Sequence, residues 1–292
     1  MHFTKVKGIL SSKNGMNLFR GCTHGCIYCD SRSKCYQMNH KFEDIEVKEN
    51  GISLLEESLK RKRKKCMIGL GSMTDPYIKE ELGLNYTRQA LEIINKFGFG
   101  VTLITKSANV LRDLDLLKEI NSKAKCVIQM TLTTYDEELC KKIEPNVSTT
   151  KERVEALKIL RDEGIPTVVW LTPILPFIND TEGNIIGILN YCKEAKVFGI
   201  ICFGMGVTLR EGNREYFYSH LDKKFPKLKE RYMREYGNNY VANSVNNKKL
   251  MGVFHEFCGR KGIVHDNEAI FNYLGLFEGK DISKQLSFFD EV

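Results

Sequence analysis

Short apolar runs alternate with longer segments of helical periodicity through most of the chain. Six runs are nearly continuous and rich in β-branched residues, as in the strands of a parallel sheet that helices cover. These predicted strands lie at 16–19, 66–70, 100–105, 126–132, 167–171 and 199–203. Five segments between them have the spacing of amphipathic helices, at 52–65, 86–97, 110–121, 150–163 and 184–196. The pattern therefore predicts a series of βα units.

Two α/β architectures are compatible with such a series. A doubly wound sheet would favour a glycine-rich turn after the first strand, whereas this chain places a cysteine-rich loop there. The pattern favours a partial (βα)6 barrel of the TIM type, whose functional residues follow the strands at their carboxyl ends. We predict a core barrel over 14–207, a mostly helical, basic and aromatic C-terminal extension over 208–280, and a flexible tail over 281–292.

Composition adds the class of protein and its compartment. The 292 residues are 42% hydrophobic and 28% charged, which excludes wholesale disorder. The chain has neither an apolar run of about 18 residues nor a signal-peptide core, so we expect a cytoplasmic protein without a membrane partner. The net charge is +7, and residues 210–261 hold twelve Lys and Arg against six Asp and Glu. That imbalance permits a polyanionic partner.

The ten cysteines are too sparse for a disulfide scaffold, and three of them share one loop. Cys22, Cys26 and Cys29 have the spacing Cys-x3-Cys-x2-Cys in CTHGCIYC. Three thiolates can hold three irons of a 4Fe–4S cluster and leave the fourth iron open for S-adenosylmethionine. Electron transfer into the sulfonium then produces a 5′-deoxyadenosyl radical. A zinc site that adds Cys35 or His24 is the alternative interpretation.

The segment GCTHGCIYCDSRS, with an aromatic residue before the third cysteine, resembles the signature of the radical SAM superfamily. More narrowly, the chain is similar to the group related to spore photoproduct lyase, which includes proteins similar to DNA repair photolyases. The segments that match are GSMTDPY (71–77), ITKS (104–107), EPN (144–146), ER (152–153) and TPILPFIND (172–180). The resemblance implies a lyase or another radical-modifying enzyme with a 4Fe–4S cluster, S-adenosylmethionine and an electron donor such as flavodoxin or ferredoxin.

The resemblance also implies where the cofactor lies. The metal ligands would be Cys22, Cys26 and Cys29, and the expected S-adenosylmethionine contacts are Tyr28, Gly71, Ser72, Thr74, Lys106, Thr131, Arg153 and Pro173. Ser107, Glu144, Pro176, Asn179 and Asp180 lie in the matching segments, and Thr133 lies at the end of the strand expected over 126–132. Each of these positions also has an ordinary structural interpretation as a turn, an ion pair or a helix cap.

One departure from spore photoproduct lyase concerns the residue that returns a hydrogen atom. That family carries its donor cysteine in a Cys-Thr-Ser-Asp run, whereas residues 72–75 here read Ser-Met-Thr-Asp. A hydroxyl is a much poorer hydrogen-atom donor than a thiol. The weak substitutes are Cys140, Cys202, Tyr135 and Tyr216, for each of which buried packing is the competing role.

Three segments bear on a nucleic-acid substrate. The run KRKRKK (60–65) is either a nucleic-acid signal or a solvated helix end. Residues 217–240 interleave aromatic with basic residues, which suits either base stacking with phosphate contacts or an amphipathic helix that buries its aromatic side chains. The chain ends with a peptide similar to those that bind the bacterial sliding clamp, with Gln285, Leu286, Phe288 and Phe289 as the contacts. We therefore expect damaged or modified DNA as substrate. A radical SAM enzyme acting on a peptide or small molecule, and a non-enzymatic zinc-binding adaptor of the clamp, remain alternatives.

Overall fold

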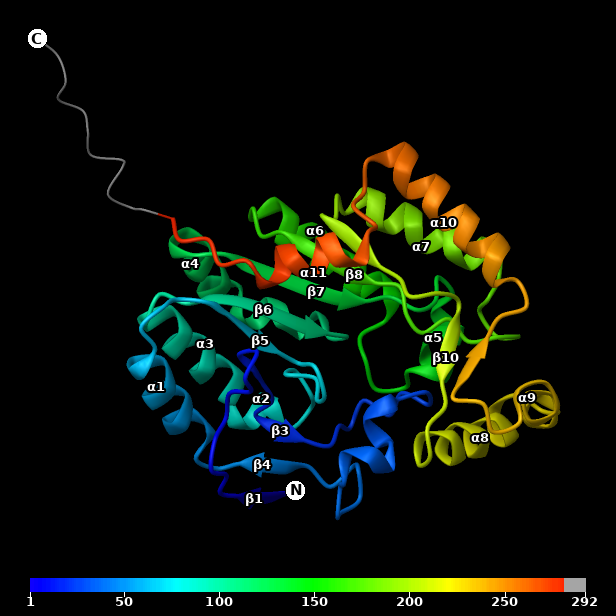
Figure 1. Cartoon of the computed structure of the whole chain (residues 1–292), viewed down its shortest axis with the longest axis horizontal. Helices are drawn as coiled ribbons and strands as arrows, with labels where there is room; N and C mark the ends of the chain where they lie inside the picture. The colour runs from blue at the N-terminus through cyan, green and yellow to red at the C-terminus, as the bar shows by residue number, and fades with distance from the viewer. Residues whose placement is uncertain (281–292) are drawn as a thin grey trace, which may run out of the picture.

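A six-stranded parallel sheet forms the centre of the computed structural model, which describes residues 1–280 (Figure 1). Its strands follow one another in the order of the sequence. They are β2 (Gly15–Met16), β5 (Met67–Leu70), β6 (Gly100–Thr105), β7 (Cys126–Thr131), β8 (Thr167–Trp170) and β9 (Gly199–Ile201). Sequential parallel order with helical crossovers is the topology of a (βα) barrel that is not closed. The α/β partial-barrel prediction is confirmed.

Helices connect successive strands and cover the outer face of the sheet. They are α1 (Gly51–Arg61), α2 (Glu81–Leu84), α3 (Tyr86–Lys96), α4 (Leu114–Lys123), α5 (Glu137–Ile143), α6 (Thr150–Asp162) and α7 (Glu182–Glu194). Thr149 begins α6 through a capping box: its hydroxyl accepts the Glu152 N–H while the Glu152 carboxylate accepts the Thr149 N–H. The turn Gly164–Ile165–Pro166 then leads directly into β8. Local sequence signals therefore determine both ends of this βα unit.

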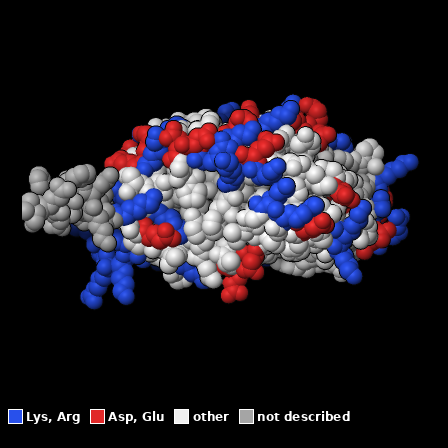
Figure 2. Space-filling model, turned by 90° about the horizontal axis from the view of Figure 1, so that it is seen from above, with Lys and Arg blue, Asp and Glu red and all other residues white. Residues whose placement is uncertain are grey.

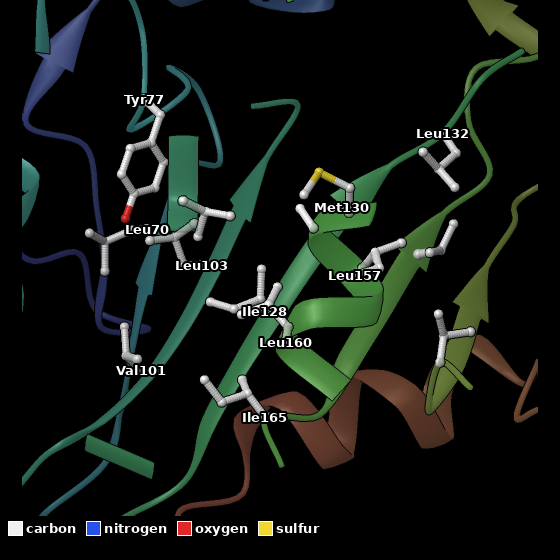
Figure 3. Packing of buried hydrophobic residues seen from close by; sticks show 14 of the residues in the cluster. Leu70, Tyr77, Val101, Leu103, Ile128, Met130, Leu132, Leu157, Leu160 and Ile165 are labelled. Atoms are coloured by element: carbon white, nitrogen blue, oxygen red, sulfur yellow. The ribbon is translucent and has the colours of Figure 1, made fainter. Parts of the chain in front are cut away.

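The core lies between the outer face of the sheet and these helices. Side chains that alternate along the strands, such as Ile128 and Met130 of β7, point toward Leu157 and Leu160 of α6 (Figure 3). All four are inaccessible to solvent. Burying one such side chain contributes roughly 1.5–3 kcal/mol. This packing holds the carboxyl ends of the strands in place.

Smaller elements flank the barrel. A three-stranded sheet joins β1 (His2–Thr4), β4 (Glu46–Lys48) and β3 (Phe19–Arg20), and β10 (Gly206–Thr208) pairs with β11 (Val241–Asn243). The remaining helices are α8 (Asn213–Lys224), α9 (Leu228–Tyr236), α10 (Asn247–Lys261) and α11 (Asn267–Gly275). In Figure 1, α10 lies along α7, while α11 crosses in front of β7 and β8. Where the barrel ends and the extension begins stays a prediction.

The predicted elements and the observed ones differ at several places. The expected strand at 16–19 is divided between β2 and β3, because the chain leaves the barrel after Met16 and Phe19 pairs with Val47 of β4. The helix expected over 52–65 ends at Arg61, so much of the basic run follows the helix. The pattern also does not predict the short helices α2, α5 and α11, or the strands β1, β4, β10 and β11 outside the barrel sheet. Within residues 1–280, every helix is too short or too polar to cross a membrane.

Candidate active site at the carboxyl ends of the strands

A cavity of about 540 Å³ opens at the carboxyl ends of the parallel strands. One wall is the cysteine loop after β2 and β3, and the floor is formed by the residues that follow β5, β6, β7 and β8. The opposite wall comes from Phe203, Gly204 and the β10–β11 pair. Loops after the strands of a barrel carry its catalytic groups, so this cavity is the candidate active site.

Backbone contacts with distant segments hold the cysteine loop. The Cys22 N–H donates to the Phe42 carbonyl at 3.1 Å, and the Ile27 N–H donates to the Ile143 carbonyl at 3.0 Å. The Asn146 N–H donates to the His24 carbonyl, also at 3.1 Å. Hydrogen bonds therefore hold the loop on two sides, to the segment before β4 and to the end of α5 and the turn after it.

The three thiols of the loop all line the cavity. Cys22 and Cys26 are buried and Cys29 is half-buried. Burial, together with the Asp75 charge, raises the pKa of the free Cys22 thiol to about 12. Burial also raises the pKa of the Cys26 thiol, while Lys106 opposes that rise. Metal binding requires thiolates, so a metal that binds here must displace protons from these thiols.

A buried ion pair supports the loop from behind the cavity. The Glu144 carboxylate accepts hydrogen bonds from the Tyr28 hydroxyl, the Arg153 guanidinium and, at 3.1 Å, the Thr133 hydroxyl. Arg153 also donates to the Thr131 carbonyl at 2.6 Å. Burial alone would raise the pKa of Glu144, but the Arg153 and Lys106 charges outweigh it and hold that pKa below its usual value. Tyr28, next to Cys29, is thereby held in one position.

A second carboxylate organises the segments after β5 and β6. Asp75 accepts the Lys106 N–H at 2.7 Å and the Thr105 hydroxyl at 2.7 Å, and His24 Nδ1 lies 3.5 Å from it. Asp75 therefore joins the loop after β5 to the end of β6 and to the cysteine loop. The half-buried Lys106 side chain lines the cavity. Burial would lower the pKa of Lys106, but the nearby Cys26 and Glu144 charges raise it above its usual value.

The structure brings together most of the cofactor contacts that the sequence predicts. Those that line the cavity are Tyr28, Gly71, Ser72, Lys106, Thr131 and Pro173. Thr74 and Arg153 are buried outside the lining, and the two terminal amino groups of Arg153 contact Glu144 and the Thr131 carbonyl, while its Nε has no hydrogen-bond partner. Asn179 and Asp180 are also buried: Asn179 accepts the Leu175 N–H and Asp180 accepts the Ser244 hydroxyl. These four positions stabilise loops around the site.

The proposed hydrogen donors do not gather at the cavity. Cys140 is buried against Arg153 and Glu144, and Cys202 is buried beside Met251. Tyr135 is 47% exposed and packs against Tyr191, and Tyr216 covers the Arg32 guanidinium. Among the described residues, the cavity lining contains no cysteine besides the three of the loop. The four donor predictions therefore gain no support from their positions.

Sequence reasoning missed part of the lining. Tyr36 and Phe203 both line the cavity, and Phe203 is 63% exposed although it follows a buried strand. Asn243 and Val241 reach the cavity from a strand that the pattern did not predict. A large aromatic residue directly after the last barrel strand was the one local signal available for Phe203. The other three depend on long-range folding.

A partial parallel barrel with a three-thiol loop at the carboxyl ends of its strands defines the class of iron–sulfur barrel enzymes. The family model of the radical SAM superfamily matches residues 16–189, and the chain belongs to this superfamily. Its members use a 4Fe–4S cluster, S-adenosylmethionine and an electron donor. The chain is thus a radical SAM enzyme, and the zinc-adaptor alternative is wrong.

Comparison with known proteins shows sequence relatives. An uncharacterized protein of Methanocaldococcus jannaschii is 32% identical over 229 residues, which cover 78% of this chain and 81% of that protein. A radical SAM Nα-GlyT isomerase of Pseudomonas phage M6 is 24% identical over 159 residues, which cover 54% of this chain and 32% of the isomerase.

Solved structures of spore photoproduct lyase have the same fold. One mutant of that lyase matches with a TM-score of 0.63 at 15% identity, covering 89% of this chain and 79% of the lyase chain. A second mutant, with bound AdoMet and dinucleoside spore photoproduct, matches with a TM-score of 0.57 at 15% identity, covering 85% and 74%. The predicted similarity to this group is confirmed at the level of the fold.

Proposed function

We propose that Cys22, Cys26 and Cys29 hold the 4Fe–4S cluster and that the strand ends hold S-adenosylmethionine. The single observation that carries this proposal is that one cavity is lined by all three free thiols together with the residues after five parallel strands. Soft thiolate donors are the ligands that iron–sulfur clusters require. When bound, the reduced cluster supplies the electron that cleaves S-adenosylmethionine to a 5′-deoxyadenosyl radical.

The chain's own residues suit a zwitterionic amino-acid group near the thiols. Lys106 presents a cation to the cavity, which favours a carboxylate, and Ser72 presents a hydroxyl. Gly71 has φ of +94°, and a Cβ there would lie 2.1 Å from the Ile104 carbonyl oxygen. Only glycine therefore allows the chain to turn this closely after β5. Pro173 and Thr131 complete the lining on the side of β7 and β8.

The first test is reconstitution of wild type and Cys26→Ala with iron and sulfide under anaerobic conditions. After dithionite reduction, we expect brown wild-type protein to release 5′-deoxyadenosine and Cys26→Ala to release none. Cys66→Ala, which changes a half-buried thiol outside the cavity, is the matched control and should behave as wild type. Equal activity of Cys26→Ala and wild type would refute the assignment of the ligands.

We further propose that the substrate presents a nucleobase of DNA to this cavity. Phe203 lines the cavity and lies near Trp170 and Phe271, with ring centroids 6.1 and 6.2 Å away. An exposed aromatic ring at the mouth of a cavity provides a face on which a base can stack. The lyase structure with a dinucleoside photoproduct supports the same class of substrate.

The distribution of charge supports a DNA substrate less strongly than the exposed Phe203 ring does. On the face in Figure 2, Lys and Arg are interspersed with Asp and Glu around an uncharged band. Residues 210–261 hold twelve basic and six acidic residues, and this excess of positive charge can contact phosphates. The peptide or small-molecule alternative keeps one specific observation in its favour, since the described lining has no additional thiol to return hydrogen to a DNA lesion.

Binding of a fluorescent single-stranded oligodeoxynucleotide separates these substrates. We expect the affinity to fall steeply with salt, and Phe203→Ala to weaken binding by about 1–3 kcal/mol, the contribution of one base–aromatic stack. Phe271→Ala removes a neighbouring ring that does not line the cavity and should have a smaller effect. Salt-independent binding with no effect of Phe203→Ala would instead support a peptide or small-molecule substrate.

A further inference from the structure

Two histidines and a carboxylate converge outside the cavity, at β1 and the segment that precedes β4. His2 of β1, with His40 and Asp44 of the loop before β4, place one ligand atom each within 4.8 Å of one another. None of these three residues lines the cavity. The cluster is therefore separate from the proposed cofactor site.

A hydrogen bond of the His40 imidazole leaves its second ring nitrogen with a lone pair that can bind a metal ion. His40 Nδ1 lies 2.9 Å from the Lys41 carbonyl, which places the proton on Nδ1 and leaves Nε2 as an acceptor. His40 Nε2 is buried and has no hydrogen-bond partner. Its nearest charged neighbour is the Glu46 carboxylate, at 3.3 Å, and both side chains are almost buried (13% and 12% exposed). A lone pair that faces a carboxylate is repelled unless a cation lies nearby.

The backbone positions the second imidazole. His2 pairs with Glu46 in the parallel register of β1 and β4, and its N–H donates to the Ile45 carbonyl at 2.9 Å. His2 Nδ1 is 3.0 Å from Asp44 Oδ2, whose partner oxygen Oδ1 receives the Met1 amino group at 2.6 Å. The His2 and His40 rings are 4.8 Å apart and nearly perpendicular, at 86°. Their nitrogen atoms can therefore approach one ion from different directions.

We propose that His2, His40 and Asp44 bind a divalent transition-metal ion of the zinc class, with Glu46 as an adjacent carboxylate. Two imidazoles with one or two carboxylates are a donor set typical of Zn²⁺. The Lys41 carbonyl is the outer-shell acceptor that orients a ligating histidine. The ion also neutralises the two carboxylates that face His40 and His2.

Such an ion would stabilise the proposed cluster loop at a distance. The segment between His40 and Asp44 contains Phe42, whose carbonyl accepts the Cys22 N–H at 3.1 Å. The Phe42 ring also covers the Arg32 guanidinium, 4.2 Å from the ring centroid. Binding an ion to His2, on β1, and to both ends of this segment would fix the position of the Phe42 carbonyl. The metal site is thus a structural support for the loop of Cys22.

Equilibrium dialysis of the cluster-reconstituted protein against Zn²⁺, with metal analysis, tests the site. We expect one zinc per chain in wild type, and at least about tenfold weaker binding in His40→Gln and in Asp44→Asn. His265→Gln is the matched control, because its Nδ1 also lies 2.9 Å from a backbone carbonyl but it belongs to no such group. X-ray absorption at the zinc edge should show nitrogen and oxygen neighbours without sulfur.

The outcomes that overturn the proposal are distinct from failure of the cluster assignment. Absence of bound zinc would refute the site, as would zinc surrounded by sulfur or equal affinity in His40→Gln and wild type. The control His265→Gln should bind zinc as tightly as wild type. If zinc binding is weakened equally in His40→Gln and His265→Gln, the loss reflects general misfolding and counts against the proposed site. These variants change no cavity residue, and failure of the cluster assignment is measured separately, by the iron content and 5′-deoxyadenosine release of wild type and Cys26→Ala.

Discussion

At the residue scale, Glu144 is the group on which most of the buried polar contacts behind the cavity depend. It accepts from Tyr28, Thr133 and Arg153, and both Glu144 and Arg153 are inaccessible to solvent. A buried ion pair adds little net stability compared with an apolar pair, yet removing one partner leaves the other charge uncompensated. The pair therefore holds Tyr28 in position more than it stabilises the fold.

Replacing Glu144 by Gln removes the charge but keeps an amide that can bond Tyr28. We expect the free energy of unfolding to fall by about 3–5 kcal/mol, because Arg153 is left as an unpaired buried cation. Chemical denaturation measures this loss. Glu138→Gln on α5 breaks only an exposed ion pair with Lys141 and should change stability by about 0.5 kcal/mol or less. A loss of similar size in both variants would contradict the account.

The difference in stability between wild type and Glu144→Gln should depend on pH in one direction. The pKa of Glu144 is lower in the folded protein than in the unfolded chain, so its stabilising contribution is present above the unfolded pKa of about 4.3. It is lost as the pH falls through the folded pKa. We expect the stability advantage of wild type over Glu144→Gln to be constant near neutral pH and to shrink in acid. An advantage that grows in acid would show that another group is responsible.

At the element scale, the cysteine loop has little regular structure of its own and depends on its neighbours for shape. Gly21 has φ of +90°, and a Cβ there would lie 2.4 Å from the Phe42 carbonyl oxygen. That carbonyl is the acceptor for the Cys22 N–H. The approach of these two backbones therefore requires glycine at this position.

Gly21→Ala should displace the loop from Phe42 and store about 1–3 kcal/mol of backbone strain in whatever native structure remains. We expect less iron per chain after reconstitution than in wild type, measured by metal analysis. Gly8→Ala is the control, because a Cβ at Gly8 meets no atom within 4 Å. Normal iron content in Gly21→Ala would show that the loop does not need this backbone approach.

At the scale of the whole molecule, the barrel and the residues after it build the site jointly. The cysteine loop and the strand ends form one side of the cavity, and β10 with β11 closes the other. The predicted clamp-binding residues 285–289 lie outside the described residues, so this interaction stays a prediction. The described lining of the cavity runs from residue 22 to residue 243, so the chemistry proposed for the cavity can be tested separately from clamp binding.

Replacing Leu286 and Phe289 together by Ala should abolish binding to a purified bacterial sliding clamp and leave S-adenosylmethionine cleavage at the wild-type rate. Apolar side chains that fill pockets on a partner carry most of the energy of such short peptides. Interferometry with immobilised clamp measures the binding. Ser287→Ala, inside the same peptide, is the control and should still bind. Undiminished binding of the double variant would remove the clamp as a partner through this segment.

Most of the barrel was predictable from the sequence because its signals are local. Apolar runs mark all six barrel strands: β6 has the predicted bounds 100–105, and the strand predicted at 16–19 is shorter in the structure. The spacing of Cys22, Cys26 and Cys29 was enough to indicate three ligands on one loop. Strand order followed from the choice of a barrel over a doubly wound sheet, because the strands of a (βα) barrel lie side by side in sequence order.

Which residues contact one another around the cavity and the cysteine loop was decided only by the tertiary structure. Arg153 is a helix residue for which the family resemblance left open a cofactor contact or an ion pair, and packing of α6 against α5 places it beside Glu144. Phe42, His40 and His2 are brought to the cysteine loop by pairing of β1 and β3 with β4. Periodicity reports which face of an element is buried but not which neighbour buries it. The sequence by itself therefore determined the barrel and its thiols, and long-range packing determined which residues surround those thiols.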